Sequence, residues 1–181
     1  ISCFIIDKET EGLSTGKAEE KLGIRSSDTC ELYFDQVRIS KENLVGNLGD
    51  GFKIALSTLD GGRIGIASQA LGIAQASLDH SISYSKERKQ FGKPIANNQI
   101  IQFKLADMAM EIEAARMLTH KAAWKKDSKV NFSASASMAK VYSSEVAMRA
   151  STQCVQIHGG YGYIKETGVD RLMRDAKITQ I

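Results

Sequence analysis

A glycine cluster near the C-terminal end of the chain is a residue pattern that could belong to a ligand-binding loop. Gln156, Ile157 and His158 lead into Gly159-Gly160. Glycine has no side chain, so a ligand can approach the backbone closely at such a pair. A Rossmann dinucleotide loop would require a strand before the glycines, and here a helical pattern precedes them. From the residues alone, the end of a helix followed by a tight turn explains the glycines.

Charged residues stand at two other predicted helix ends. From the residues alone, Arg88 is an exposed cation near a helix C-terminus, where it interacts favourably with the helix dipole. Asp60 and Arg63 flank Gly61-Gly62 and could form an ion pair near a helix start. Polar residues where a loop meets a helix are also biased towards binding, so ligand contact stays open as a second interpretation.

The sequence contains no recognisable metal or nucleophile motif. Histidines lie far apart, with no HExxH or His/carboxylate spacing, and there is neither a GxSxG elbow nor a phosphate-binding GxxxxGK loop. The cysteines are odd in number and lack a CxxC pair, which predicts a reducing compartment and small buried thiols rather than disulfides. These histidines and cysteines are His80, His120, His158, Cys3, Cys30 and Cys154.

Composition excludes two broad functional classes. Of 181 residues, 24 are Lys or Arg and 21 are Asp or Glu, so a net charge of +3 without a dense basic run argues against nucleic-acid binding. No apolar run approaches the roughly 20 residues that span a bilayer, so we expect no membrane span. A hydrophobic content of 43% is enough for a sizeable core in one or two domains.

The elements that would position these residues fall into a β part and a helical part. Residues 1–6 and 31–39 have strand-like patterns, separated by glycines and serines. Two or three strands do not form a stable sheet alone, so we expect the rest of the sheet to precede residue 1. The chain opens at Ile1 without a Met and closes at Ile181, and we expect it to be part of a longer protein.

Four helices are predicted after the β part. They cover about residues 51–89, with a break near Asp60-Gly61-Gly62, then about 99–126 and 133–157, and a short helix starting near Val169. Apolar residues recur every three or four positions in two of them, as a core-facing stripe requires. The stripes are Ile101, Leu105, Met108, Ile112 and Ala115, then Tyr142, Val146, Ala150, Cys154 and Ile157. The predicted fold is α+β: the remnant of a β-domain (1–45) followed by an up-and-down four-helix bundle (46–181).

Several motifs together carry a resemblance to a known family. From Gln156, the chain resembles the C-terminal motif of the acyl-CoA dehydrogenases at eight positions of fixed spacing. Residues 88–94 resemble the family's Arg-x-x-Phe-Gly-x-Pro turn, residues 21–29 a loop of its middle β-domain, and residues 51–53 with 60–63 the entry to its C-terminal domain. Residues 65–76 are most similar to the short-chain branch. The eight positions are Gln156, Gly159, Gly160, Gly162, Tyr163, Glu166, Arg171 and Asp175.

This resemblance implies a flavoenzyme. Members of the family bind FAD across a subunit interface, usually in a homotetramer that is a dimer of dimers. They convert an acyl-CoA thioester to the trans-2-enoyl-CoA and pass electrons to an electron-transfer flavoprotein. The implied location is the mitochondrial matrix, or the cytoplasm if the source is bacterial. The fragment would hold the later part of the middle β-domain and most of the C-terminal helical domain.

Site residues also follow from the resemblance, position by position. The substrate-binding set is Asp60, Gly61, Gly62 and Arg63, and the cofactor-binding set is Arg88, Phe91, Gln99, Gln156, Ile157, His158, Gly159 and Gly160. Arg88 would meet the FAD pyrophosphate, because a planar guanidinium suits phosphate oxygens. The family's catalytic Glu would lie just beyond Ile181, since Gly62 occupies its alternative place and carries no side chain.

Other functions remain open on the same scaffold. A short/branched-chain acyl-CoA dehydrogenase, an acyl-CoA oxidase or an enoyl-CoA reductase would each keep the fold and change the chemistry. A catalytically dead helical assembly protein would keep the fold and lose the base.

Overall fold

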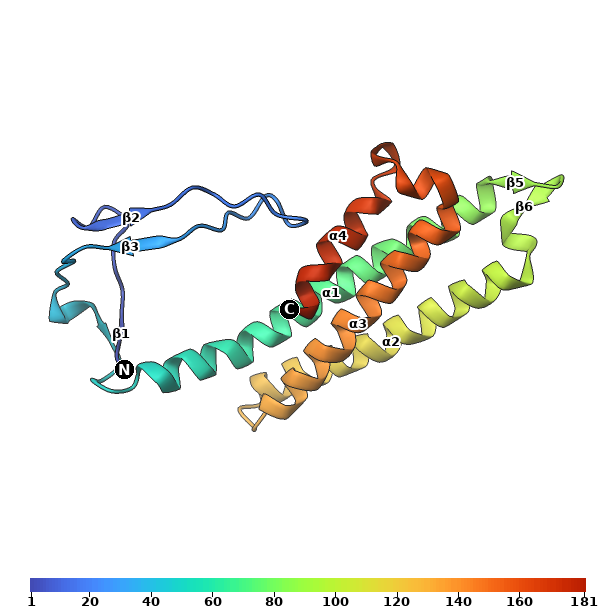
Figure 1. The fold of residues 1–181 in the computed structure, drawn as a ribbon. Coiled ribbons are helices and arrows are strands. Elements are labelled where there is room, and N and C mark those ends of the chain that lie inside the picture. Colours follow the sequence, from blue (N-terminus) through green and yellow to red (C-terminus); the bar gives the residue numbers. More distant parts are fainter. The chain divides into compact units, whose positions relative to one another are not determined.

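A computed structural model describes residues 1–181 and divides the chain into two compact units, Ile1–Leu59 and Asp60–Ile181. Helix α1 (Gly51–Glu87) contributes residues to both units (Figure 1). The domain boundary at residues 45–46 stays a prediction. No helix of the structure is both long and apolar enough to cross a membrane.

The first unit contains two short antiparallel strand pairs. Strand β1 (Cys3–Phe4) pairs with β4 (Leu44–Val45), and β2 (Leu13–Thr15) pairs with β3 (Leu32–Phe34), while the 3-10 helix η1 (Lys41–Asn43) precedes β4. Both strands are shorter than the predicted ranges 1–6 and 31–39, because a strand extends only as far as its pairing partner. Gly51 is the only buried residue before Asp60. Two-stranded pairs of this kind are marginally stable alone, as expected from the sequence.

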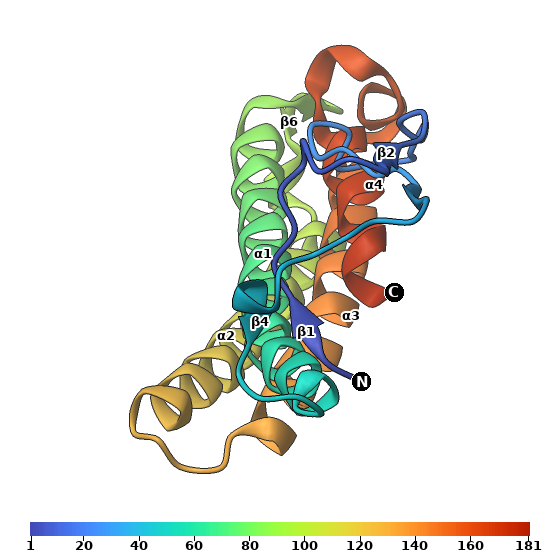
Figure 2. The same cartoon turned by 90° about the vertical axis from the view of Figure 1, so that its left-hand side faces the viewer.

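The second unit is a helical bundle. Helices α2 (Gln99–Asp127), α3 (Ser133–His158) and α4 (Val169–Gln180) share a core with α1, and Figures 1 and 2 show these helices from two directions. A tight hairpin, β5 (Lys89–Gln90) and β6 (Lys93–Pro94), and the 3-10 helix η2 (Ile95–Asn97) connect α1 to α2. Between α3 and α4 lie the 3-10 helices η3 (Gly159–Tyr163) and η4 (Lys165–Thr167).

Helix α1 is continuous, so the predicted break near Asp60-Gly61-Gly62 is wrong. Glycine inside a helix costs only about 1 kcal/mol, and local contacts can offset that. Here Arg63 forms an ion pair with Asp60 one turn earlier, and Ser133 Oγ donates a hydrogen bond to the same carboxylate from the start of α3. These contacts stabilise the helical turn that contains both glycines.

The core of the bundle confirms the two predicted apolar stripes. Met108, Ile112 and Ala115 of α2 are buried against Val146 and Ala150 of α3, with other stripe residues partly or fully buried around them. Among the cysteines, Cys154 is buried, but Cys30 is exposed, so the prediction of three buried thiols is wrong. Cys30 lies in the first unit, which has no core to receive it.

Small hydroxyl side chains share this core with the apolar ones. Ser77, Ser81 and Ser85 of α1 are completely buried, and each donates its hydroxyl to a carbonyl three or four residues earlier in the same helix. Thr119 of α2 does the same and also lies 3.2 Å from Ser143 of α3 between their hydroxyl oxygens. Because each hydroxyl has an internal partner, the desolvation penalty of an unpaired polar group is avoided.

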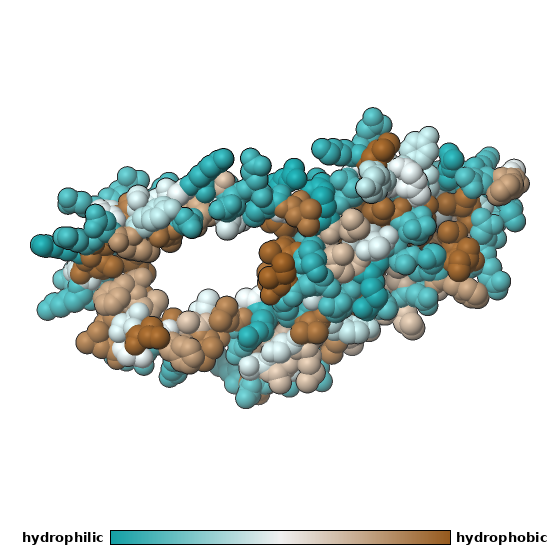
Figure 3. All heavy atoms as spheres, viewed as in Figure 1, coloured by the Kyte–Doolittle hydropathy of each residue, from teal (hydrophilic) through white to brown (hydrophobic).

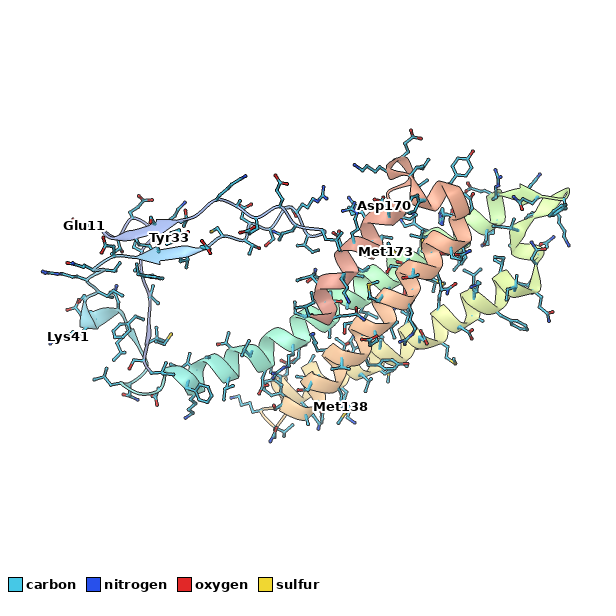
Figure 4. The ribbon with its side chains drawn as sticks, viewed as in Figure 1. Glu11, Tyr33, Lys41, Met138, Asp170 and Met173 are labelled. Carbon is cyan, nitrogen blue, oxygen red and sulfur yellow. The ribbon has the colours of Figure 1, made fainter.

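Polar side chains cover much of the outer surface, although hydrophobic side chains also reach it (Figure 3). On α4, Asp170 forms an ion pair with Arg174, with an N–O distance of 3.1 Å. Asp170, Met173 of the same helix and Met138 of α3 are labelled in Figure 4.

Candidate functional site

A cavity of about 540 Å³ lies where α1 ends, α2 begins and α3 ends. Tyr84 and Arg88 line it from the end of α1, and Asn98 lines it next to the start of α2. The remaining wall comes from the end of α3 and the following turns: Ile157, His158, Gly159, Gly160, Tyr161 and Ile164, with Gln90, Ile95, Ile100 and Ile101 completing the lining. The site therefore joins segments about 70 residues apart in sequence, which only the bundle brings together.

Arg88 supplies the positive charge of this cavity. Its backbone is fixed on both sides: the N–H donates to Tyr84 O at 2.8 Å, and the carbonyl accepts from Ile95 N–H at 2.9 Å. The guanidinium carbon lies 5.5 Å from the centre of the Tyr161 ring, within range of a cation–π interaction. No carboxylate pairs with Arg88, so the guanidinium can serve an external anion.

Gly159 and Gly160 leave the backbone open beside the cavity. Gly159 ends α3 with φ +61°, a conformation that favours glycine. A Cβ atom placed on Gly159 or Gly160 would meet no other atom within 4 Å. Gly160 has no positive φ, so neither packing nor backbone strain within this chain requires a glycine there. Close approach of a bound molecule is a physical reason for one.

Gly162 is a glycine for a different reason. A Cβ atom there would lie 2.5 Å from Val155 O and 2.9 Å from His158 Cβ. The turn after α3 therefore folds directly back on the last turn of the helix. This contact fixes the direction in which Gly159 and Gly160 face.

His158 is the buried polar group of the site. The residue is only 7% exposed, and its imidazole ring stacks on the Tyr84 ring with centroids 4.1 Å apart. Nδ1 lies 2.8 Å from Cys154 O, and the Tyr84 hydroxyl donates to His158 O at 3.3 Å. Burial lowers the pKa of His158, which makes the imidazole neutral near pH 7. Burial likewise raises the pKa of the Cys154 thiol.

The structure brings together five of the eight residues predicted to bind a cofactor. Arg88, Ile157, His158, Gly159 and Gly160 line the cavity. Phe91, Gln99 and Gln156 do not line it and are exposed. Phe91 is 98% exposed at the tip of the β5–β6 hairpin, where its φ of +49° precedes Gly92 at +79°.

Sequence reasoning missed Tyr84, Asn98 and Tyr161 as residues of the same site. Tyr84 had a usable signal, because it lies four residues before Arg88 and thus on the same face of a helix. Tyr161 directly follows the glycine pair. Asn98 had no such signal, since its position depends on the path of the hairpin between the helices.

The predicted substrate residues form a second cluster away from the cavity. Asp60 pairs with Arg63 and accepts a hydrogen bond from Ser133 Oγ at 3.1 Å. A Cβ on Gly61 would lie 3.2 Å from Lys126 Nζ, whereas one on Gly62 would meet nothing within 4 Å. The ion pair that the residues alone suggested is therefore present, and one further cation, Lys126, stands beside Gly61.

Comparison with known proteins identifies the relatives of this chain. Residues 49–181 match the family model "Acyl-CoA dehydrogenase, C-terminal domain". All 181 residues align at 56% identity with 47% of the short-chain specific acyl-CoA dehydrogenase of Megasphaera elsdenii. They align at 55% identity with 44% of the mouse short-chain specific acyl-CoA dehydrogenase, a mitochondrial protein. The chain thus spans about half the length of the curated relatives it matches.

Solved structures give the same result. Butyryl-CoA dehydrogenase from Megasphaera elsdenii matches with a TM-score of 0.98 at 56% identity, over 99% of this chain and 47% of that chain. A chain in the structure of the electron transferring flavoprotein of Acidaminococcus fermentans matches with a TM-score of 0.98 at 52% identity, over 99% and 47% of the two chains. An acyl-CoA dehydrogenase from Bacillus anthracis complexed with FAD matches with a TM-score of 0.94 at 33% identity, over 99% and 34%.

The helical bundle, the glycine turn beside a basic cavity and these alignments along the whole chain agree, and the chain belongs to the acyl-CoA dehydrogenase family.

Proposed function

We propose that this chain is part of an FAD-dependent short-chain acyl-CoA dehydrogenase, which converts a short acyl-CoA to the trans-2-enoyl-CoA and passes the electrons to an electron-transfer flavoprotein. The observation that supports this most directly is the cavity with Arg88 and the open glycine backbone, in a chain 56% identical to a short-chain specific relative. FAD, when bound, supplies the hydride acceptor.

The cavity residues fit the adenosine diphosphate end of FAD. Arg88 offers a planar, permanently charged donor without an internal carboxylate partner, which suits a diphosphate. Gly159 and Gly160 have open space where side chains would otherwise stand. The aromatic rings of Tyr84, His158 and Tyr161 provide flat apolar surface beside these polar groups. One cavity thus offers a cation for the diphosphate, open backbone for close approach and aromatic rings for apolar contact.

The exposed cofactor residues support sharing of FAD between subunits. Phe91 is almost fully exposed at the tip of a hairpin, and Gln99 and Gln156 are exposed as well. Exposed aromatic side chains are common anchors at protein interfaces. In a homotetramer built as a dimer of dimers, these three residues would contact FAD bound mainly by a neighbouring chain.

The cluster around Asp60 is the proposed contact for the acyl-CoA. Arg63 and Lys126 bring positive charge to a helix surface where Gly62 leaves room for an extended chain. Gly62 cannot act as a base, so we place the carboxylate that removes the α-proton outside residues 1–181. Location follows the source: the mitochondrial matrix in a eukaryote and the cytoplasm in a bacterium.

A substitution at Arg88 tests the cofactor site. In the full-length protein, Arg88→Lys keeps the charge but loses the two-pronged guanidinium, so FAD should dissociate more readily. Arg149→Lys is the matched control, because Arg149 pairs with Glu111 between α2 and α3 and does not line the cavity. Flavin content after gel filtration and the FAD Kd are the measurements. Equal FAD retention in both variants would remove Arg88 from the cofactor site.

The substrate class is tested by kcat/KM for straight-chain acyl-CoAs and for 2-methyl-branched short ones. A pocket open at depth should gain about fourfold per added methylene, whereas a closed pocket loses far more by steric overlap. We expect a maximum at roughly four to six carbons. A maximum at longer chains would contradict short-chain specificity, and a preference for branched acyl groups would assign the short/branched-chain branch. Rapid reoxidation by oxygen would instead indicate an oxidase.

A further inference from the structure

We propose that His158 determines which ligand the cavity accepts: its Nε2 atom accepts a hydrogen bond from an N–H or O–H donor on the adenosine end of the cofactor. This inference rests on the proposed function, because it takes FAD as the occupant of the cavity. It adds a specific hydrogen-bond acceptor and the chemistry of the group that would meet it.

The tautomer of His158 follows from its partner. Nδ1 lies 2.8 Å from Cys154 O, and a carbonyl oxygen can only accept a hydrogen bond. Nδ1 therefore carries the proton. The same nitrogen is 3.8 Å from the Cys154 sulfur, a much weaker contact that does not change this assignment. In a neutral imidazole with its proton on Nδ1, Nε2 keeps a free lone pair and acts only as an acceptor.

The ring cannot turn away to satisfy Nε2 elsewhere. It is stacked on Tyr84 with an interplanar angle of 24°, and its Nδ1 hydrogen bond holds it to its own helix. The Tyr84 hydroxyl is turned to the backbone carbonyl of His158, so it does not donate to the imidazole. Rotation of the ring would break both the stack and the hydrogen bond.

Nε2 has no hydrogen-bond partner in the protein, and the neighbouring ionisable side chain that acts on the same imidazole is His80 of α1. His158 is 7% exposed as a whole, and its only hydrogen-bond contacts through the ring are those of Nδ1. Every completely enclosed side-chain nitrogen or oxygen in a non-exposed residue does have a hydrogen-bond partner. Nε2 must therefore be reached from outside, and His158 is part of the cavity wall. A largely buried acceptor facing a binding cavity discriminates strongly in favour of a ligand that donates to it.

The chemical groups of FAD limit which of its atoms can donate a hydrogen bond to Nε2. Ionised phosphate oxygens accept hydrogen bonds and cannot donate to Nε2, and they are drawn to Arg88 instead. Adenosine carries two kinds of donor, the exocyclic amine of the base and the ribose hydroxyls. Both can donate a hydrogen bond to Nε2.

The test compares FAD with two analogues, one lacking the exocyclic amine of the purine and one lacking the 2′-hydroxyl of the adenosine ribose. Their Kd values are measured on the full-length protein after removal of flavin, and on His158→Met and His158→Gln. Gln can place an accepting oxygen near the position of Nε2, whereas Met has a similar length but is a poor acceptor. Melting temperatures confirm that both variants fold.

We expect one of the two analogues to bind the unmodified protein about three- to tenfold more weakly than FAD, the usual effect of one hydrogen bond. This difference should vanish in His158→Met and persist at least in part in His158→Gln. The analogue that shows it identifies amine or hydroxyl as the donor. An equal difference in His158→Met, or none in the unmodified protein, would overturn the role of His158. If Arg88→Lys still weakens FAD binding in that case, the cofactor site stands and only this inference fails.

Discussion

Two glycines, separated by a single residue, should respond in opposite ways to the same substitution. At Gly162, a Cβ would lie 2.5 Å from Val155 O and 2.9 Å from both Val155 Cα and His158 Cβ. Two of these atoms belong to the backbone of α3 and cannot move independently of the helix. Gly162→Ala should therefore destabilise the folded protein by about 1–3 kcal/mol, in the range of overpacked sites. At Gly160 there is no atom within 4 Å of the new Cβ.

Gly160→Ala should leave the free energy of unfolding unchanged or raise it by about 0.4–1 kcal/mol, because alanine restricts the unfolded chain. Its effect should appear in FAD binding, since the added methyl group stands at the cavity wall. Urea unfolding of the flavin-free protein gives the first quantity, and titration with FAD gives the second. A lowered stability in Gly160→Ala, or a normal stability in Gly162→Ala, would refute the steric argument. Unchanged FAD affinity in Gly160→Ala would show that no ligand approaches this backbone.

Three other outcomes are expected. Tyr161→Leu should raise the FAD Kd about two- to fivefold, because it removes the cation–π contact to Arg88. Tyr161→Phe keeps the ring and should leave the FAD Kd unchanged. An equal rise of the FAD Kd in both variants would rule out the ring as the cause. Burial lowers the pKa of His158 below its ordinary value of 6.5, so the unfolded chain takes up this proton first as the pH falls. The associated stability is complete above about pH 6.5 and declines below it, and Tm measured between about pH 7 and 5 should fall less steeply in His158→Met. Asp60→Asn should raise the KM for acyl-CoA, whereas Ser133→Ala should lower stability by about 1 kcal/mol with little effect on KM; matching KM changes would assign Asp60 a structural role only.

The sequence was sufficient to predict the helices of the bundle and the stripes that face its core. Residues such as Met108, Ile112 and Val146 recur at helical spacing because one face of each helix is buried. The break in α1 was predicted wrongly, because the contribution of Ser133 to the turn at Asp60 comes from a helix more than 70 residues away. Local glycine content cannot report such a contact. Strand lengths were also overestimated, since pairing partners rather than side-chain patterns set the ends of β1 and β3.

The candidate site was predictable only in part. Arg88 and the glycine pair stood out by residue type and through the family resemblance, and the structure places them at one cavity. The orientation of His158 could not be predicted, because it depends on the stack with Tyr84 and the hydrogen bond to Cys154 O. Neither contact has a signature in residue spacing. The resemblance alone suggested that Phe91 belongs to a cofactor site, and its exposure is consistent with a contact in a neighbouring chain.

The buried serines of α1 have a consequence for how this protein can vary in evolution. Since Ser77 and Ser85 satisfy their hydroxyls within α1, the neighbouring helices sense only the small size of these side chains, whereas the Ser81 hydroxyl also meets the Cys154 thiol of α3. Substitution of these serines by alanine or glycine should therefore be common among natural relatives. Valine or leucine should be selected against, because the larger side chains would force the helices apart. Selection at these positions acts on volume, and a sequence profile that scores polarity would misread them as surface.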